Sequence, residues 1–421
     1  MELLIKGGRV IDPASGRDEI ADVLVRDGVI AAIGAGLQTT GETIDAAGLW
    51  VTPGLIDIHT HLREPGYEYK EDVATGARAA AAGGFTAVCC MANTDPVNDS
   101  AAVTRLILDR AAEAGQARVY PIGAATSGLH GEDMAPIGEL VETGCVAFSD
   151  DGHPIASGRL MRLCMQYANQ FGKKIISHAE DLDLVAGGLM NEGHEATRAG
   201  LRGNTRAAEE TMVARDIVIA KAYGLPVHIA HVSTRGSVDL VRWGKSLGVQ
   251  VTAETAPHYL AGTDALCATW DAKAKVNPPL RTQDDQQALI EGLLDGTVDC
   301  IATDHAPHHA DEKNVEFELA ANGISGLETA FTLSKKALVD SGLATPMQLI
   351  DLMSHAPAKV LGLPGGALQI GAAADISLFD PDVAWVIDPE KFVSKGKNSP
   401  FGGVEVVGKA VGVLVGGNKV L

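Results

Sequence analysis

The middle of the chain alternates short, continuous apolar runs with alanine-rich stretches of helical character, such as DVATGARAAAAGG and AAVTRLILDRAAEAG. Apolar runs without a polar alternation are typical of strands that are buried on both faces, as in a parallel sheet covered by helices. Eight runs fit this description: residues 54–61, 85–93, 117–126, 144–152, 173–181, 226–233, 249–258 and 299–308. Eight strand and helix units predict an α/β fold, a (β/α)8 TIM barrel.

The two ends of the chain have a different texture. Residues 1–54 contain short β segments separated by glycines, and residues 365–421 repeat that pattern. Neither end holds enough strands for a stable sheet of its own. We therefore expect both ends to pair as one small, discontinuous β-sandwich domain beside a barrel made of residues 55–364.

Nearly every apolar run of the predicted barrel ends in a polar residue, and most of these residues are able to bind a metal ion. They are His59, His61, Asn93, Asp150, Asp151, His178, His231, His258 and Asp304. The carboxyl ends of barrel strands gather at one mouth, where the active sites of this fold lie. Residues that are far apart in the sequence are therefore expected to become neighbours there.

Four of the histidines and two of the aspartates predict a metal centre. The set is His59, His61, Asp151, His178, His231 and Asp304. One catalytic zinc needs only three protein ligands and an open position, so two metal ions that share a bridging carboxylate use this set better. Each histidine taken singly could instead be an ordinary buried residue, and Asp304 could cap a helix. Strand alternation does not decide between Asp150 and Asp151, because both lie so near a turn.

Arg63 follows His61 by two positions, and its planar guanidinium is suited to a carboxylate. Alternate residues of a strand point to the same side, so we expect His59, His61 and Arg63 to share one face. The chain has 34 basic and 54 acidic residues and a net charge of −20, which disfavours nucleic acid and anionic membranes as partners. An acidic protein needs a few local cations such as Arg63 to bind an anionic substrate.

Cysteine usage and the first residues bear on the compartment. The six cysteines show no CxxC spacing and lie mostly inside apolar runs, so we expect them to be buried in a reducing environment. The N-terminus lacks a basic segment followed by an apolar stretch, and no run approaches the ~18 apolar residues of a membrane span. These features predict a soluble, cytoplasmic protein.

Eight short motifs together resemble a known family. They read IDIHTHLREPG, MANTDP, FSDDG, SHAED, AHVST, ETAPHYL, KVNPPLR and ATDHAPH. In this combination, across the whole chain, they are similar to the bacterial dihydroorotases of the amidohydrolase superfamily. The resemblance implies the reversible cyclisation of N-carbamoyl-L-aspartate to L-dihydroorotate in pyrimidine biosynthesis. It also implies two divalent metal ions, with zinc as the default.

The resemblance further implies a role for each candidate residue. His59 and His61 would hold one metal together with Asp304, His178 and His231 would hold the second, and Asp151 would bridge them. Asp304 would also be the general acid and base. The substrate-binding positions would be Arg63, Asn93, Asn277, His308, Asn322 and Gly323. One segment departs from the family pattern, because Ala320-Ala321-Asn322-Gly323 stands where Ala-Pro-aromatic-Gly is usual. The shape of that loop is therefore left open.

Two other functions are alternatives to this one. Hydantoinases, dihydropyrimidinases and allantoinases resemble the chain but usually bridge their metals with a carboxylated lysine, and no lysine occurs between Val119 and Gly172. An inactive dihydroorotase-like scaffold of aspartate transcarbamoylase would have lost metal ligands that this chain keeps. For an active enzyme we expect a small-molecule substrate and a homo-oligomer such as a dimer, and association with aspartate transcarbamoylase is left open.

Overall fold

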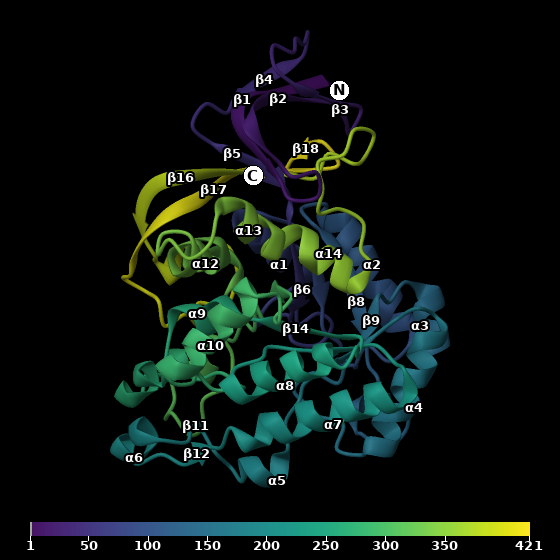
Figure 1. Ribbon diagram of the computed structural model, residues 1–421, viewed down its shortest axis with the longest axis vertical. Helices are drawn as coiled ribbons and strands as arrows, with labels where there is room; N and C mark the ends of the chain where they lie inside the picture. Colours follow the sequence, from purple (N-terminus) through teal and green to yellow (C-terminus); the bar gives the residue numbers. More distant parts are fainter. Residues whose placement is uncertain (1) are drawn as a thin grey trace.

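The eight apolar runs form one parallel sheet in sequence order in the computed structural model, which describes residues 2–421 (Figure 1). The strands are β6 (Leu55–Thr60), β7 (Phe85–Cys90), β8 (Arg118–Gly123), β9 (Ala147–Phe148), β10 (Ile175–Ser177), β13 (Val227–Ile229), β14 (Val251–Thr255) and β15 (Cys300–Ile301). A parallel bridge between Thr60 and His305 joins the two edges of the sheet. The sheet therefore closes, and the predicted (β/α)8 barrel is confirmed.

Helices follow the strands and cover the outside of the barrel (Figure 1). The longer ones are α1 (Val73–Ala82), α2 (Ala101–Ala114), α3 (Ile137–Thr143), α4 (Gly158–Gln170), α7 (Ala207–Tyr223), α8 (Arg235–Ser246), α10 (Gln283–Leu294) and α12 (Ala330–Leu338). The Asp72 carboxylate accepts a hydrogen bond from the Thr75 amide at 2.7 Å and so begins α1. Four alanines of α1 are buried, Ala77, Ala79, Ala80 and Ala81, and their small side chains let the helix lie close to the strands.

Shorter elements complete the barrel and its loops. They are α5 (Leu182–Val185), α6 (His194–Ala199), α9 (Pro257–Ala261), α11 (Ala310–Lys313), α13 (Pro346–Ile350), α14 (Ala356–Leu361), β11 (Met190–Asn191) and β12 (Gly203–Asn204). The strands of the barrel are shorter than the predicted runs. Most of the predicted runs continue past the strand as a loop that carries the polar residues, whereas His59 lies within β6 and His258 lies in α9.

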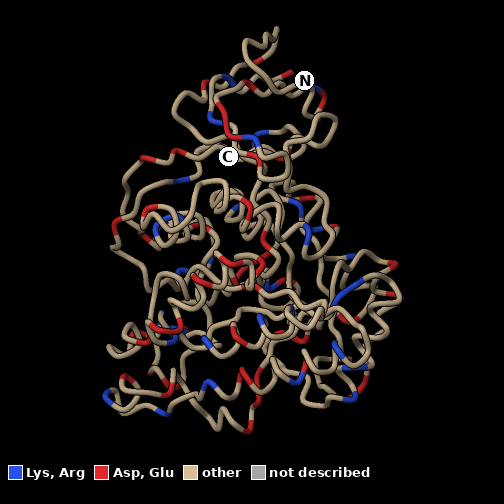
Figure 2. The backbone as a smooth tube through the Cα atoms, viewed as in Figure 1, with Lys and Arg blue, Asp and Glu red and all other residues tan. Residues whose placement is uncertain are grey.

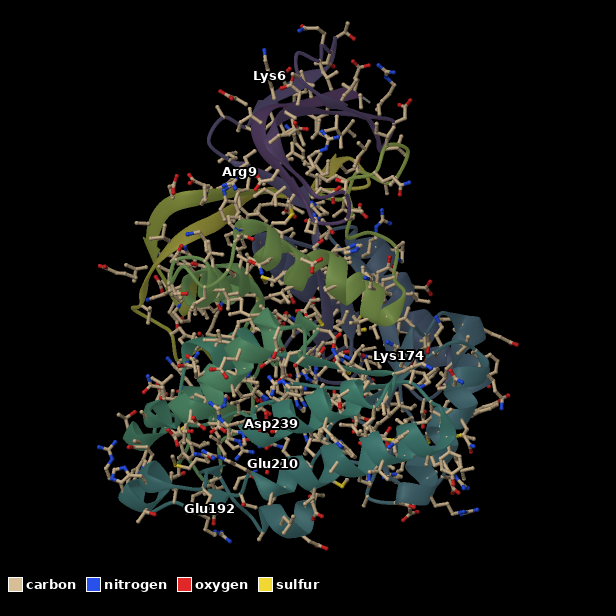
Figure 3. All side chains as sticks on the ribbon, in the orientation of Figure 1. Lys6, Arg9, Lys174, Glu192, Glu210 and Asp239 are labelled. Carbon is tan, nitrogen blue, oxygen red and sulfur yellow. The ribbon has the colours of Figure 1, made fainter. Side chains whose placement is uncertain are left out.

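Strands from both ends of the chain pair in a second, mixed sheet. They are β1 (Glu2–Asp12), β2 (Arg17–Arg26), β3 (Val29–Gly34), β4 (Glu42–Asp45), β5 (Trp50–Pro53), β16 (Ile376–Val386), β17 (Glu405–Val415) and β18 (Asn418–Lys419). The two ends meet where β16 runs antiparallel to β5, with Ile376 opposite Pro53. Lys6 and Arg9 mark β1 in this domain (Figure 3). The β domain is discontinuous, as the sequence predicts, while its limits at residues 54 and 365 stay a prediction.

Aromatic side chains join the β domain to the barrel. Phe331 on α12 stacks on Phe379 of β16 with ring centroids 3.9 Å apart, and Trp50 of β5 meets Phe331 edge to face at 6.1 Å. Trp50, Phe331 and Phe379 belong to the same apolar cluster as the residues between the barrel strands and their helices. These three aromatic residues therefore connect the β domain to the core of the barrel, while the β domain also has an apolar cluster of its own.

Replacing Phe379 by alanine should lower the free energy of unfolding by about 3–5 kcal/mol, because the ring is fully buried and its loss leaves a cavity. Urea denaturation of the metal-free protein would measure the change. Val411→Ala on β17 is the control, since Val411 is 47% exposed and its truncation should cost less than about 0.5 kcal/mol. Equal unfolding midpoints for both variants would show that the aromatic contact between the β domain and the barrel contributes little to stability.

The structure also shows where the cysteines and the charged residues lie. All six cysteines are buried and free, as predicted. Acidic and basic residues are both spread over the β domain and the barrel (Figure 2). Among residues 2–421, no helix has the length and apolar character that a membrane crossing requires.

Candidate metal centre and substrate pocket

The six predicted metal-binding side chains meet at the mouth of the barrel, and all of them are buried. They are His59 and His61 at the end of β6, Asp151 after β9, His178 after β10, His231 after β13 and Asp304 after β15. The backbone is unusual at two of them, since His231 has φ +33° and Asp304 has φ +47°. Residues other than glycine rarely adopt such angles, and they do so most often where surrounding structure imposes a functional geometry.

Asp151 lies at the centre of this group. Its Oδ1 is 3.4 Å from His59 Nε2, 3.4 Å from His178 Nδ1 and 3.3 Å from His231 Nε2. Its Oδ2 is 3.5 Å from His61 Nε2. The potential ligand atoms thus form two groups that share Asp151, one with His59 and His61 and one with His178 and His231. Two groups with a common carboxylate suggest a binuclear metal site.

Asp304 lies against the first of these groups. Its Oδ1 is 3.1 Å from His61 Nε2 and 3.5 Å from His59 Nε2. Burial alone would raise the pKa of this carboxyl, but the neighbouring His59 and His61 outweigh burial and lower it. The pKa of Asp151 is held well below its ordinary value in the same way, since His59, His178 and His231 oppose the effect of burial. Both carboxylates are therefore ionised at neutral pH and available to a cation.

Two buried polar atoms test whether metal ions fit here. His59 Nε2 and Asp151 Oδ1 have no hydrogen-bond partner within the described part of the chain, although they lie 3.4 Å apart. Buried polar atoms without a partner are costly and rare in folded proteins. A cation that accepts both lone pairs removes that cost. Imidazole nitrogens and carboxylate oxygens are also a donor set that suits zinc and similar divalent ions.

Three of the four histidines have an acceptor at the ring nitrogen that faces away from the centre. The pairs are His59 Nδ1 with Glu254 Oε1 at 2.6 Å, His61 Nδ1 with Asn93 Oδ1 at 2.9 Å and His178 Nε2 with Glu180 Oε2 at 3.2 Å. A neutral imidazole that donates from one nitrogen presents a lone pair on the other. These acceptors therefore orient the inner nitrogens toward a common centre, as the outer partners of metal-binding histidines usually do.

A cavity of about 180 Å³ opens beside the metal-binding atoms. Every predicted substrate-binding residue lines it: Arg63, Asn93, Asn277, His308, Asn322 and Gly323. Candidate metal ligands line the same cavity, among them His61 and Asp304. A molecule bound in this cavity would therefore contact the metal centre and the predicted substrate-binding residues together.

Arg63 reaches the cavity by a route that the sequence analysis did not foresee. Strand β6 ends at Thr60, and Arg63 has φ +65°, so strand alternation does not place it beside His61. The prediction of one shared strand face is wrong for this residue, because the chain turns before it. The guanidinium donates to the Pro307 carbonyl at 3.2 Å and has no carboxylate within ion-pair distance among residues 2–421. A cation without an anionic partner beside a cavity favours an anionic ligand.

The loop around Asn322 has a defined shape. Burial and the charge of Arg63 lower the pKa of His308 to about 3, so the ring is neutral and donates from Nε2 to the Asn322 carbonyl at 2.8 Å. Gly323 has φ +149°, and a Cβ at this position would lie 2.6 Å from the Ala306 carbonyl oxygen. The glycine is therefore required, whereas the other three residues of the departing segment are not constrained in this way.

Comparison with known proteins decides the family. The chain is 53% identical to the dihydroorotase of Syntrophotalea carbinolica over 418 residues, which cover 99% of this chain and 98% of that protein. It is 54% identical to the dihydroorotase of Geobacter metallireducens over 422 residues, or 100% of this chain and 99% of that one. The chain belongs to the dihydroorotase family. Residues 48–237 also match the family described as Dihydro-orotase-like.

Solved structures place the dihydroorotase family fold beside that of hydantoinases. The L-hydantoinase (dihydropyrimidinase) from Arthrobacter aurescens superposes with a TM-score of 0.88 at 27% sequence identity, over 99% of this chain and 95% of that one. The architecture of this chain is thus shared with that hydantoinase. In this dihydroorotase family member an aspartate, Asp151, lies between the two histidine pairs.

Sequence reasoning missed the buried partners of the histidines. Glu254 in β14 contacts His59, and its Oε2 is 3.1 Å from His228 Nε2, while His228 Nδ1 is 2.9 Å from Thr252 Oγ1. His228 thus lies against Glu254 and supports it. Burial alone would raise the pKa of Glu254, and His59 and His228 outweigh burial and lower it. The available signal was a glutamate inside an apolar run, which needs partners when buried.

Replacing Glu254 by glutamine should weaken metal binding about 10- to 100-fold, because the carboxylate no longer fixes the His59 ring. Titration of the metal-free protein against a coloured chelator would measure the affinity. Glu192→Gln is the control, since Glu192 is exposed just after β11, at the bottom of the view in Figure 3, and does not line the substrate pocket. Unchanged affinity in Glu254→Gln would remove Glu254 from this positioning role.

Proposed function

We propose that this member of the dihydroorotase family catalyses the reversible cyclisation of N-carbamoyl-L-aspartate to L-dihydroorotate and water, in the cytoplasmic synthesis of pyrimidines. The observation that carries the proposal is the cavity that Arg63 and several candidate metal-binding residues line together. Dihydroorotate is a cyclic amide that bears a carboxylate. A cation for the carboxylate and a metal centre for the ring carbonyl match those two features.

The residues that would hold the metal ions follow from the geometry and from the family. His59, His61 and Asp304 would hold one ion, His178 and His231 the other, and Asp151 would bridge the pair. Zinc is the first choice, because imidazole and carboxylate are ordinary zinc ligands. When bound, a metal pair activates water and polarises a carbonyl.

The chain's own residues would bind and orient the substrate. Arg63, Asn93 and His308 would hold the ring carboxylate, with the guanidinium fork as the principal contact, and Asn277 would line the same pocket. The backbone at Asn322 and Gly323 would complete the pocket. The reacting amide would then lie next to Asp304.

Asp304 would carry the proton. In ring opening its carboxylate takes a proton from the attacking water and gives it to the departing ring nitrogen, as the bond between that nitrogen and the carbonyl carbon breaks. In cyclisation the same proton moves in the reverse direction. Asp304 is suited to this task because it is ionised, lines the cavity and touches His61.

Substrate preference tests the proposal against the hydantoinase alternative, which the shared fold keeps as the second candidate. Dihydroorotate should be opened with a kcat/KM roughly 100-fold or more above that of dihydrouracil, hydantoin or allantoin, because rings without a carboxylate leave Arg63 unpaired. N-carbamoyl-L-aspartate should also be cyclised. A higher kcat/KM for a ring without a carboxylate would indicate a hydantoinase-type activity instead.

Removal of the metal ions should abolish activity, and zinc, cobalt or manganese should restore it. Elemental analysis of the restored protein should find two ions per chain, one for each ligand group. Turnover that survives complete chelation would contradict a metal-dependent reaction. If no metal gave any activity, the protein would instead be an inactive scaffold.

We also propose a homodimer, and association with aspartate transcarbamoylase stays a prediction. Size-exclusion chromatography of the protein alone would give the mass of the assembly. Coelution with the transcarbamoylase would test the second point.

A further inference from the structure

A second cavity, of about 200 Å³, lies next to the substrate pocket, and its walls are rich in lysine. Four lysines line it, from η3 (Ala272–Ala274), from α11 and from the segment between β16 and β17: Lys273, Lys313, Lys395 and Lys397. Glu390 is the one carboxylate among the described lining residues. His308 lines both this lysine cavity and the substrate pocket, so the two are neighbours.

Lys313 is a buried cation without a counterion. Its side chain is 5% exposed, and its Nζ donates to the carbonyl oxygens of Ala272 at 2.9 Å and Lys275 at 3.0 Å. An ammonium group has three N–H donors, so one remains without an acceptor in residues 2–421. Burial, together with the charge of Lys275, lowers the pKa of Lys313 to about 7. A buried charge of this kind is costly unless an anion accompanies it.

The other lysines add to the same charge. Lys397 Nζ donates only to backbone carbonyls, including that of Ser394 at 2.8 Å, and Lys273 has no side-chain partner in the described part of the chain. Lys395 pairs with Asp72. Three of the four lysines therefore lack a carboxylate partner, in a protein whose net charge is −20. Their convergence on one cavity is not explained by the general composition of the chain.

We propose that the lysine cavity binds a compact anion with at least two negative charges, of the phosphate or dicarboxylate class. Ammonium groups bind such anions as mobile point charges, and several of them around one cavity raise the local positive potential. The bound anion would neutralise the charges of Lys313 and Lys273, and the lining carboxylate of Glu390 would repel it. No established step of ring opening or closure uses this cavity.

An anion in the lysine cavity would also act on the substrate pocket. It would lie behind His308, on the side away from the substrate carboxylate, and would weaken the positive potential that Arg63 provides there. The expected effect is a KM for dihydroorotate about threefold higher with little change in kcat. The lysine cavity would thus let a small metabolic anion reduce substrate affinity.

Isothermal titration of the metal-loaded protein tests the proposal, with inorganic phosphate and succinate as probes and acetate at matched ionic strength as the reference. Phosphate or succinate should bind and acetate should not, and the stronger of the two probes identifies the anion class. The double variant Lys273→Met, Lys397→Met should weaken binding roughly tenfold or more. Glu390→Gln should strengthen it about twofold, which a folding defect would not do. Lys221→Met is the matched control, because Lys221 is exposed on α7 outside the cavity.

Several results would overturn the proposal. They are the absence of binding by both probes, equal heats with acetate, and unchanged binding in the double lysine variant. Arg63→Met separates the two cavities, since an anion held in the lysine cavity keeps most of its affinity in this variant and an anion held in the substrate pocket loses it. The coupling to Arg63 should weaken anion binding in this variant by no more than about threefold, so a loss of tenfold or more in Arg63→Met would also overturn the proposal. Because binding is measured without turnover, failure of the proposed reaction would be seen separately.

Discussion

Replacing Asp304 by asparagine should lower kcat by about 10²- to 10⁴-fold, because the amide keeps the shape of the side chain but cannot accept a proton. Metal content should largely persist, since His59, His61 and Asp151 remain in place around the same position. Ring opening and ring closure should fall together, as both use the same proton transfer. Steady-state assays in both directions, with elemental analysis of the same samples, would measure these effects.

Asp264→Asn is the matched control for this experiment. Asp264 is also buried, but it accepts a hydrogen bond from Asn191 and does not line the substrate pocket. Its replacement should leave kcat within a fewfold of the unmodified protein. Near-normal turnover in Asp304→Asn would remove Asp304 from the proton transfer, while complete loss of metal would show that its main role is as a ligand.

The barrel could be predicted from the sequence because its physical cause is periodic. Strands buried on both faces must be apolar throughout, and polar residues are tolerated only where the strands end at the mouth. The rule identified all eight strands and the residues that follow them. It could not choose between neighbours in a turn: the Asp150 carboxylate accepts hydrogen bonds from the amides of Ala125 and Thr126, whereas Asp151 faces the histidines.

Backbone conformation at the site could not be predicted in this way. Arg63, His231 and Asp304 all have positive φ, and nothing in their local sequence indicates it. Such angles are unfavourable for residues with a side chain, so they persist only because contacts from elsewhere in the fold impose them. Strand alternation therefore correctly predicted that His59 and His61 lie together. It also predicted that Arg63 lies near them, but Arg63 reaches that position through a turn and not along the strand.

Contacts between residues on different barrel strands could not be predicted from the sequence for a related reason. The bond between His59 and Glu254 joins residues 195 positions apart. Alternation states which face a side chain lies on, but the register between strands determines which residue it meets. In the structure Ile229 pairs with Ala253 and Glu254 pairs with Cys300 in adjacent strands, and this register sets Glu254 behind the metal centre.

Replacing Arg63 by methionine should lower kcat/KM for dihydroorotate about 30- to 1000-fold, the equivalent of ~2–4 kcal/mol for a charge-assisted pair, with metal content unchanged. Activity on dihydrouracil, which has no carboxylate, should be nearly unaffected, so the preference for dihydroorotate should collapse. The kcat/KM of Arg63→Lys for dihydroorotate should lie between those of the unmodified protein and Arg63→Met, because an ammonium keeps the charge but lacks the planar fork. An unchanged ratio between the two substrates in Arg63→Met would mean that the carboxylate is bound elsewhere. A fall in activity on both rings would instead mean that Arg63 shapes the pocket, since it also holds the Pro307 carbonyl.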